Sequence, residues 1–512
     1  MKARPNSERN MKKILASLDF GNSVAEFDDS LEKYFVENQA FDDLIKNKVD
    51  IVAGDKGTGK TALFQILNKR YGSIKALAGV EVLAGFNPAG SPIFQKLVRE
   101  QVLTEGQYAS VWKAYVVALA GNWALDIAGR DHSHSFQLLA EMLDETGLMS
   151  KDDKPETIFA KIINAVQRTF IPKELEMEFT ISETGVPIIT PKISFGKKEE
   201  QVMKEVSHDE ALTLLDRCLG ELGFSLWIVL DRLDEAFQGF PSVEIPALRA
   251  LLRTYLDLLP YKNVRLKLFV RRDLLNRITE GGFVNLTHIN ERKVEIKWGE
   301  ADLLHLLCRR IRDNTDVMKL LVKENEPPIS DEELFYKIFP NKVDQATRKP
   351  TTWNWMMKRI RDGNKVYPPR NLIGLTKNAR DEQLKIEGRA PRPFVEGTPL
   401  IASEALRAAL SSLSETRVQD TLLAEAIPRV SNYIQKFKKQ RAEHNQVSLM
   451  AILGLQGESL DAAVLQLVQI GFLEELKTTW KIPMLYRDGL KITQGKAFPA
   501  EPSTEESDED DE

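Results

Sequence analysis

Residues 50–61, DIVAGDKGTGKT, pass from three apolar residues after Asp50 into a loop that contains three glycines and two lysines. The loop matches the pattern G-x-x-x-x-G-K-[ST], with Gly54, Gly59, Lys60 and Thr61 at its fixed positions. Three apolar residues in a row suit a strand that is buried on both faces of a parallel sheet. The stretch therefore predicts a strand, a phosphate-binding loop and a helix in succession.

Each part of this loop has a physical task. The glycines allow the backbone to curl, so that successive N–H groups point into one concavity. Lys60 is expected to reach the terminal phosphates of a nucleotide, and the Thr61 hydroxyl to bind Mg²⁺. The helix predicted over residues 61–67 turns its positive end toward the phosphates. The predicted ATP-binding residues are Gly54, Asp55, Lys56, Gly57, Thr58, Gly59, Lys60, Thr61 and Ala62.

A second acidic segment follows much later in the chain. Residues 226–235, LWIVLDRLDE, are five apolar residues that run into a cluster of acids. A buried strand that ends in an aspartate presents a Mg²⁺ ligand beside the phosphate loop, and this predicts Asp231 on the metal side. Asp234 or Glu235 is expected to polarise the attacking water, with Glu235 preferred and Asp234 left open. The alternative is an ordinary core strand followed by a solvated acidic turn.

A third apolar strand is predicted over residues 266–270, and a fourth over residues 293–298. The third strand is followed by Arg271, Arg272 and Asp273. An arginine at that end of a strand can sense or neutralise a γ-phosphate. It can equally form a surface ion pair with Asp273, and the sequence does not indicate which arginine points inward.

The bulk composition indicates an ordinary multidomain protein of 512 residues, with 43% hydrophobic and 28% charged residues. No apolar run approaches the ~20 residues that span a bilayer, and the charged N-terminus lacks an apolar segment, so no membrane partner and a cytoplasmic location are expected. Residues 501–512 hold eight acids and no base, which leaves about +3 on the rest of a chain of net charge −5. This tail is predicted to be disordered.

The cysteines and histidines predict no metal site. Two cysteines, Cys218 and Cys308, support neither a disulfide framework nor a cysteine zinc site. His132 and His134 lie in a polar stretch, and His305 lies one helical turn from Cys308. Neither set offers enough ligands for a metal, so structural roles are expected.

The order of these motifs resembles a known family. The phosphate loop is followed by VLDRLDEAF, LFVRRDLL, a helical stretch with YPPRNLIGL, and a winged-helix-like segment. This is similar to bacterial P-loop ATPases with a DRLDE-type Walker B motif, close to the STAND and KAP classes and related to AAA-type proteins. The resemblance covers residues 17–70, 226–310, 366–380 and 448–495, somewhat under half of the chain.

The resemblance implies an additional-strand ATPase that uses ATP and Mg²⁺ and assembles into oligomers, in a setting of bacterial antiphage defence. It implies that Arg370, after Pro368 and Pro369, reaches the nucleotide from a helical lid; the alternative is a solvent-facing helix residue. AAA-type members place the catalytic Glu directly after the metal-binding Asp, whereas Arg232 stands there in this chain, which suits slow turnover. The predicted catalytic residues are Lys60, Asp234, Glu235, Arg271, Arg272 and Arg370, and the predicted Mg²⁺ ligands are Thr61 and Asp231.

The expected fold is an α/β P-loop NTPase with a parallel central sheet, a helical lid domain, a β-hairpin insertion and a C-terminal winged-helix-like domain. Helices are expected near residues 104–145 and 157–170, and the hairpin over residues 175–196. The predicted domains are a helical lead-in (1–48), the ATPase core with its insertion near 100–200 (49–300), the helical lid (301–445), the winged-helix-like domain (446–498) and the acidic tail (499–512).

The favoured function is an ATP-hydrolysing switch or motor protein whose nucleotide state controls self-assembly or engagement of a protein partner. One alternative is a nucleotide-gated scaffold that scarcely hydrolyses ATP, motivated by Arg232. Another is a DNA-transacting ATPase, which would use the winged helix and a basic helical stretch with Lys436, Lys438, Lys439 and Arg441. The second helix of the wing carries no base, which argues against strong duplex binding.

Overall fold

The computed structural model describes residues 10–85, 103–150, 153–169, 180–181, 187–188, 207–236, 241–322, 327–424 and 426–499. The chain forms two compact units, which are described separately. The first, called the sheet unit, comprises Asn38–Gly54 and Lys60–Ile296. The second, called the helical unit, comprises Met1–Glu37, Asp55–Gly59 and Lys297–Glu512, and so includes the middle of the phosphate loop.

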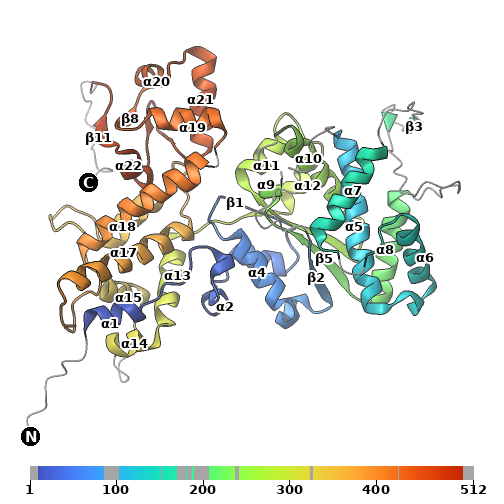
Figure 1. Ribbon diagram of the computed structural model, residues 1–512, viewed down its shortest axis with the longest axis horizontal. Helices are drawn as coiled ribbons and strands as arrows, with labels where there is room; N and C mark the ends of the chain where they lie inside the picture. The colour runs from blue at the N-terminus through green and yellow to red at the C-terminus, as the bar shows by residue number, and fades with distance from the viewer. Residues whose placement is uncertain are drawn as a thin grey trace, which may run out of the picture. The chain divides into compact units, whose positions relative to one another are not determined.

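A five-stranded parallel sheet forms the centre of the sheet unit (Figure 1). Its strands are β1 (Ile51–Gly54), β2 (Val80–Ala84), β5 (Ser225–Leu230), β6 (Val264–Arg271) and β7 (Lys293–Glu295), in the order β2-β5-β6-β1-β7. Strand β6 therefore lies between the phosphate-loop strand and the strand that precedes Asp231, as an additional-strand ATPase requires. The predicted strands are confirmed, although β7 ends at Glu295, three residues before the predicted end.

Both faces of this sheet are covered, which explains the uninterrupted apolar runs in the sequence. Alternate residues point to opposite faces. Ile51, Ile228 and Leu268 join the core that is shared with the large helices of the insertion. On the other face, the ring of Phe269 packs edge-on against Phe64 of α4 (Lys60–Arg70), with 6.0 Å between the ring centroids.

The described part of the insertion between β2 and β5 is mainly helical, as predicted. Its helices are α5 (Glu105–Ala128), α6 (His134–Glu145), α7 (Pro155–Thr169) and α8 (His208–Leu222). The short strands β3 (Thr180–Ile181) and β4 (Pro187–Ile188) pair antiparallel, which confirms a hairpin there. The remainder of the predicted hairpin, 175–179, 182–186 and 189–196, lies outside the described residues.

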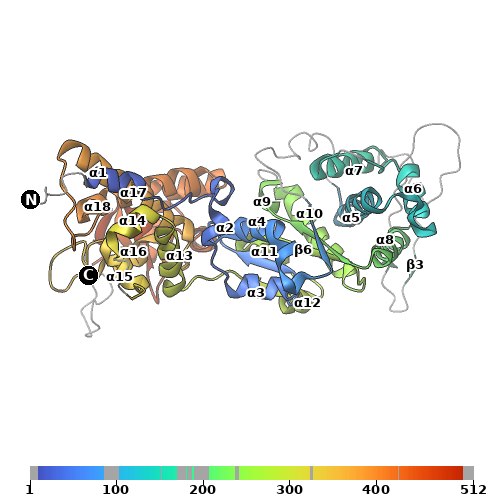
Figure 2. The same cartoon turned by 90° about the horizontal axis from the view of Figure 1, so that it is seen from below.

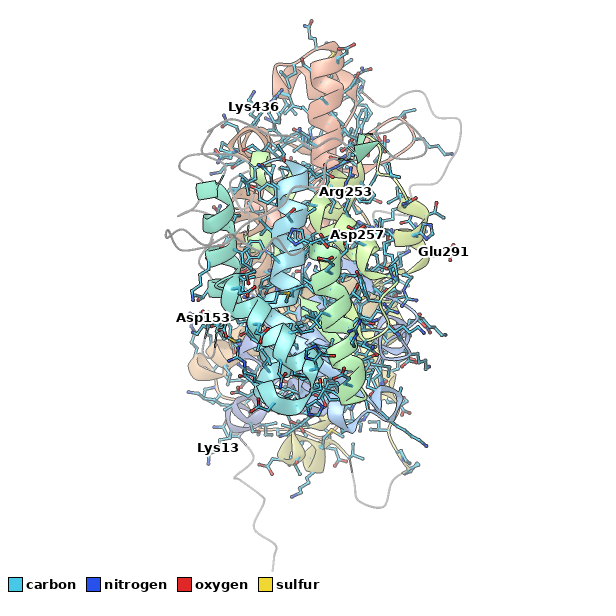
Figure 3. All side chains as sticks on the ribbon, turned by 90° about the vertical axis from the view of Figure 1, so that its right-hand side faces the viewer. Lys13, Asp153, Arg253, Asp257, Glu291 and Lys436 are labelled. Carbon is cyan, nitrogen blue, oxygen red and sulfur yellow. The ribbon has the colours of Figure 1, made fainter. Side chains whose placement is uncertain are left out.

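Helix α10 (Pro241–Leu258) packs along α5, and Figure 3 labels two of its charged residues, Arg253 and Asp257. Arg253 forms an ion pair with Glu105 at the start of α5. The Asp257 carboxylate lies 2.8 Å from the Lys113 ammonium, also on α5. Between these ion pairs, apolar side chains of α5 and α10 pack together. They belong to the same hydrophobic core as the buried residues of the sheet. Four shorter helices complete the unit: α3 (Gln39–Ile45), α9 (Leu233–Ala236), α11 (Arg272–Thr279) and α12 (Leu286–Glu291).

Two long antiparallel helices organise the helical unit, α17 (Pro369–Arg389) and α18 (Ser403–Thr416), which lie side by side (Figures 1 and 2). The predicted helix start at Pro368 and Pro369 is confirmed, since a proline suits the first turn of a helix. The other helices around this pair are α1 (Met11–Ser17), α2 (Leu31–Tyr34), α13 (Glu300–Arg312), α14 (Thr315–Leu321), α15 (Asp331–Ile338) and α16 (Thr352–Ile360).

The C-terminal part of this unit contains α19 (Pro428–Lys436), β8 (Arg441–His444), α20 (Gln446–Leu453), α21 (Gly457–Gln469), β9 (Glu474–Glu475), β10 (Trp480–Lys481), α22 (Met484–Leu490) and β11 (Thr493–Lys496). Four strands form a sheet in the order β11-β8-β10-β9. Two helices therefore precede a β9–β10 hairpin, which is the order expected of a winged helix. The stretch WKIPMLYRDGLKI, residues 480–492, predicts strand-like wing material. This prediction is wrong for residues 484–490, which form α22 after Pro483, with the side chains of Leu485 and Leu490 buried.

The prediction that Lys436, Lys438, Lys439 and Arg441 belong to a basic helical stretch is also wrong. Helix α19 ends at Lys436, whose ammonium donates to the Leu453 carbonyl at 2.6 Å (Lys436 is labelled in Figure 3). Lys439 adopts a left-handed conformation with φ of 64°, which ends the helical path. Arg441 lies in β8. The basic residues are therefore spread over a helix end, a turn and a strand.

Among the described residues, no single helix has both the length and the hydropathy of a membrane span, although α20 and α21 pass together as a pair bent by 94°.

Candidate active site

The phosphate loop begins at the carboxyl end of β1. Gly57 and Gly59 have φ of +79° and +102°, in the left-handed region that side chains disfavour. A Cβ on Gly57 would lie 3.0 Å from the Cβ of Arg370, so glycine is also required there for space. The Thr58 hydroxyl donates to the Asp55 carbonyl at 2.8 Å, which closes the turn. The loop thus has the curled backbone that its sequence predicts.

Helix α4 starts at Lys60, which places Thr61 and Ala62 in its first turn beside the loop. The Lys60 ammonium donates to the carbonyl of Gly54 at 2.9 Å. Loss of solvation lowers the pKa of this ammonium, although the negative charges of Asp234 and Asp231 act in the opposite direction. Lys60 therefore lies with both aspartates at the carboxyl edge of the sheet.

Asp231 follows β5 directly and is 1% exposed. Its carboxylate accepts hydrogen bonds from the Thr61 hydroxyl and from the backbone N–H of Arg232. In the part of the chain that the structure describes, the buried Oδ2 atom has no hydrogen-bond partner. Burial raises the pKa of this carboxyl to about 6, because few donors compensate the charge.

These residues fit a magnesium ion. Mg²⁺ prefers hard oxygen ligands, such as a carboxylate and a hydroxyl. The Thr61 hydroxyl and the Asp231 carboxylate supply both, and the Oδ2 atom of Asp231 retains its capacity to bind a further group.

Asp234 and Glu235, the two candidates for water activation, form ion pairs with different arginines. Arg232 has a φ of +56°, rare for a residue with a side chain, and this turn separates the acids that follow. Its guanidinium lies 3.6 Å from the carboxylate of Glu235, whose side chain is 43% exposed. The Asp234 carboxylate instead lies 3.3 Å from the guanidinium of Arg271, and both side chains are 29% exposed. Asp234 is therefore the acid that joins the Lys60 cluster.

Arg271, at the end of β6, is the arginine that contacts the acids. Its Nε and Nη2 atoms donate to the two carboxylate oxygens of Asp273 at 3.0 and 2.9 Å. Burial opposes the charge of Arg271, but Asp273 and Asp234 together raise its pKa. Arg272 follows it as the first residue of α11. The expected pair with Asp273 thus exists, although it is partly buried rather than at the surface.

One carboxyl group of this cluster, Glu244 on α10, is not predicted from the sequence. Glu244 is 7% exposed and accepts a hydrogen bond from Arg277 at 3.0 Å. Burial raises its pKa, and the charges of Asp234 and Arg271 also act on it. No motif marks this residue, because it occupies an ordinary position of an amphipathic helix.

Within the helical unit, Arg370 and Trp298 form hydrogen bonds with the middle of the phosphate loop. The backbone N–H of Arg370 donates to the Gly57 carbonyl at 3.4 Å, so the predicted lid arginine begins its helix against the loop. The indole N–H of Trp298 donates to the Thr58 carbonyl at 2.8 Å. Sequence analysis assigned Trp298 to a strand and missed this contact, since nothing in a local pattern indicates a partner 240 residues away.

The other candidate ligands contact protein groups. The His305 ring nitrogen Nδ1 lies 2.9 Å from the Asp331 carboxylate, and the Cys308 thiol donates to the Asp331 carbonyl at 3.2 Å. His132 packs against the ring of Phe136. Within the described ranges, no three His, Cys, Asp or Glu side chains gather in a way that could hold a metal ion.

Comparison with known proteins gives structural neighbours only. No protein-family profile matches the sequence, and no curated protein matches it either. The solved structures similar to the chain include ORC2 of Aeropyrum pernix in ADPNP–ADP complexes (12% identity, 91% of this chain and 92% of that chain, TM-score 0.38). Also similar are a Walker-type ATPase of Pyrococcus abyssi (13%, 92% and 98%, 0.39) and ORC1 of Aeropyrum pernix in complex with DNA (12%, 92% and 96%, 0.34).

Identities and TM-scores at this level do not assign the chain to either group of proteins. The fold assignment rests instead on the strand order β2-β5-β6-β1-β7 and on the glycine-rich turn between β1 and α4. Both belong to the α/β P-loop class that the sequence predicts.

Proposed function

We propose that the protein binds ATP with Mg²⁺ and hydrolyses it slowly. One observation carries the proposal: Asp231, buried after a parallel strand, accepts a hydrogen bond from Thr61 of the phosphate loop and has an unpartnered oxygen within the described residues. An acid and a hydroxyl placed in this way suit the metal that accompanies a triphosphate. Burying a carboxylate without full compensation is unfavourable, so its place beside Thr61 indicates a ligand.

The residues of the cluster divide the work of phosphoryl transfer. The loop N–H groups and Lys60 bind and orient the phosphates, with Lys60 leaving the Gly54 carbonyl when a phosphate arrives. Thr61 and Asp231 would hold Mg²⁺, which neutralises phosphate charge when it is bound. Arg271 is the strand-end arginine that faces this charge, since it lies with Asp234 in the Lys60 cluster.

We assign water activation to Asp234 rather than to Glu235. Asp234 acts on Lys60 and Arg271, whereas the pair made by Glu235 is with Arg232. The ion pair between Asp234 and Arg271 must loosen before the carboxylate can accept a proton from water. This requirement supports slow turnover, because Arg271 must leave Asp234 and bind the phosphate before the reaction can proceed.

The test is ATP turnover by the wild-type protein beside Lys60→Ala, Asp234→Asn and Glu235→Gln. Removing a general base lowers turnover by about 10²–10⁴-fold, so Asp234→Asn is expected to show this loss while it keeps ATP affinity. Glu235→Gln is expected to stay near wild type, and Lys60→Ala to lose binding. Equal turnover in wild type and Lys60→Ala would contradict the proposal. A larger loss of turnover in Glu235→Gln than in Asp234→Asn would assign water activation to Glu235 instead of Asp234.

A nucleotide-gated scaffold is the second candidate, because both strand-following acids already form ion pairs with arginines. In that case ATP binds, and the rate of hydrolysis by the wild type equals that of Asp234→Asn. The same set of variants therefore separates the enzyme from the scaffold.

The nucleotide is further proposed to control assembly or a protein partner through the helical unit. The residues that contact the loop there, Arg370 and Trp298, begin the segments that lead into α17 and α13. A setting in bacterial defence rests on the sequence resemblance alone. Cross-linking or mass measurement with and without ATP tests the assembly, which should change with ATP in wild type and not in Lys60→Ala.

The DNA alternative has less support. Helix α21 contains two acids, Glu458 and Asp461, and no base, and its exposed residues include Leu465, at 56%. A surface of this kind suits a protein partner better than a phosphate backbone. Binding of duplex DNA that weakens steeply with salt, together with stimulated ATP turnover, would restore the alternative.

A further inference from the structure

Five exposed bases gather near the C-terminal end of the helical unit. They lie in two segments, residues 437–442 and 490–499, which hold these five bases and no acid. The segments belong to the turn before β8 and to the region of β11, two strands that pair in parallel (Figure 1). The five side chains, called the basic patch, are Lys438, Lys439, Arg441, Lys491 and Lys496.

Hydrogen bonds between the two segments bring these bases together. The backbone N–H of Lys439 donates to the carbonyl of Leu490 at 2.9 Å, so the backbones of Lys439 and Lys491 lie close together. The Arg441 guanidinium reaches across to β11 and donates to the Gln494 carbonyl at 3.0 Å, two residues before the last base of the patch. The fold of this sheet therefore holds like charges near one another.

The basic patch has no counter-ion among the described residues. None of its five side chains forms an ion pair with them. The acids closest in sequence have other neighbours. Glu443 accepts a hydrogen bond from the Thr479 hydroxyl at 2.9 Å. Burial raises the pKa of the Asp488 carboxyl, and Arg359 is the base that acts against this shift. Clustered charges of one sign favour a partner of the opposite sign.

The sequence supplies such a partner directly after the patch. Strand β11 ends at Lys496, and residues 501–512, EPSTEESDEDDE, follow five positions later with eight acids and no base. A stretch of this length can extend by about 40 Å, at about 3.3–3.6 Å per residue, whereas neighbouring strands lie only about 4.8 Å apart. The acidic tail is therefore long enough to reach every base of the patch.

A tethered partner also has an advantage over a free one. A short linker holds the two groups at an effective concentration of about millimolar. A free polyanion at a lower concentration must bind correspondingly more tightly to replace the tail. Exposed charge pairs contribute little individually, so the contact depends on the number of charges and on the tether.

We propose that the acidic tail, residues 501–512, binds the basic patch of its own chain and covers it against free polyanions. Five bases without ion pairs among the described residues, followed in the chain by eight acids, carry the inference. It goes beyond the proposed function and does not rest on nucleotide binding. Duplex DNA, as a free polyanion, is the competing occupant and forms one arm of the test.

Carbodiimide cross-linking of the full chain tests the contact directly, because this reagent joins an ammonium group to a carboxylate that touches it. Peptide mass spectrometry then identifies the joined residues. At about 0.1 M salt, the tail acids are expected to be joined to Lys438, Lys439, Lys491 and Lys496. At about 1 M salt, where the screening length falls from about 10 Å to about 3 Å, the yield should fall at least about fivefold.

Three exposed lysines of the same unit, Lys12, Lys13 and Lys319, serve as controls. Cross-links to these lysines as frequent as those to the patch would show non-specific contact and overturn the inference. A mixture of unlabelled and heavy-isotope-labelled chains distinguishes contacts within one chain from contacts between chains. Mixed cross-links at the frequency of random pairing would show that the tail binds a second copy, and would overturn the inference as well.

Binding of the tail as a free peptide tests whether the patch is already covered. A fluorescent peptide of residues 499–512 is titrated into wild type and into a tail-neutral variant, in which each Glu of residues 501–512 is changed to Gln and each Asp to Asn. The uncovered patch of the tail-neutral variant is expected to bind the peptide at least about tenfold more tightly than wild type does. Equal affinity in the two proteins would overturn the inference.

Lysine variants in the tail-neutral background locate the binding site. The patch variant carries Lys438→Gln, Lys491→Gln and Lys496→Gln, and should bind the peptide at least about tenfold more weakly. The same change at the three control lysines should alter the affinity by less than about twofold. Equal losses in the two sets would show a general attraction to positive charge, and the inference would be wrong.

The DNA arm titrates a duplex of about 20 base pairs into the same proteins. Tighter duplex binding by the tail-neutral variant than by wild type, lost in the patch variant, would support a patch that the tail covers. Duplex binding that is equally tight in wild type and in the tail-neutral variant, and is lost in the patch variant, would show a nucleic-acid site that the tail leaves open. That result would overturn the inference.

Discussion

The parallel sheet holds one buried aspartate at the amino ends of its strands and another at their carboxyl ends, and the difference between the two separates structure from function. Asp50, at the amino end, is 0% exposed, and Asp231, at the carboxyl edge of the same sheet, is 1% exposed. Hydrogen bonds from Arg292 and Lys267 hold the pKa of Asp50 below its usual range, even though burial alone would raise it. Burial raises the pKa of Asp231 to about 6.

The donors around Asp50 explain this contrast. Lys267 donates to one carboxylate oxygen at 2.7 Å and Tyr255 to the other at 3.0 Å, while Arg292 contacts both. The Lys267 ammonium also lies 3.9 Å from the centre of the Trp227 ring. Both carboxylate oxygens therefore have partners, and the cluster has no capacity for a ligand.

The Asp231 carboxylate has fewer hydrogen-bond donors around it, and its Oδ2 atom has no partner among the described residues. A saturated network of buried charges stabilises one conformation, whereas an unsaturated one leaves a position for a ligand. Aspartates of equal burial thus have different roles because their donors differ in number.

The largest effect on stability is expected from Asp50→Asn. The change leaves Lys267 and Arg292 without a counter-charge, and breaking a buried pair in this way costs about 3–5 kcal/mol of the free energy of unfolding. Urea unfolding of the variant measures the loss. The control is Asp42→Asn, which removes an exposed pair with Lys46 and should change stability by less than about 1 kcal/mol. Equal stability of the two variants would contradict the comparison.

In the absence of nucleotide, Asp231→Asn is expected to raise the free energy of unfolding at high pH, whereas Asp50→Asn lowers it. A carboxyl with a raised pKa contributes stability below its usual pKa and loses that contribution as the pH rises through about 6. At pH 8 the neutral variant should therefore be more stable than wild type, by about 3 kcal/mol, and the difference should vanish near pH 4. Urea unfolding in EDTA at both pH values checks this. A variant less stable than wild type at pH 8 would show that the charge of the Asp231 carboxylate is compensated, as that of Asp50 is, and would contradict the comparison.

The smallest effect is expected from Trp298→Phe, which removes one neutral hydrogen bond from the phosphate loop and keeps the aromatic ring. A bond of this kind contributes about 1 kcal/mol, so ATP affinity should fall by roughly three- to tenfold. Calorimetric titration of ATP measures it, with Trp353→Phe as the control, since Trp353 packs against Phe335. Unchanged affinity in Trp298→Phe would show that the loop holds its shape without this contact.

Much of the sheet could be predicted, because strands buried on both faces appear as short apolar runs. The strand before Gly54 and the strand before Asp231 both have this form. Residues 484–490 were misread because their apolar residues fit either period over so short a distance, and only Pro483 indicated a helix start. The left-handed turn at Lys439 had no distinguishing signal, since lysine seldom adopts it.

Some residues of the candidate site could also be predicted from the sequence, and others could not. Lys60, Thr61 and Asp231 could be predicted, because each follows a strand within a recognisable motif. The separate partners of Asp234 and Glu235 depend on the unusual backbone of Arg232, which the sequence does not show. Glu244 and Trp298 lie far along the chain from the residues that they contact, and only folding brings them to their partners.

The central claim, that the unsaturated cluster at Asp231 holds Mg²⁺ with ATP, is tested most directly by calorimetric titration of ATP. Wild type and Asp231→Asn are each titrated with Mg²⁺ and with EDTA. We predict that Mg²⁺ strengthens ATP binding to wild type by at least about tenfold, and that this gain falls below about twofold in Asp231→Asn. An equal gain from Mg²⁺ in both proteins, or ATP binding absent from wild type, would contradict the account.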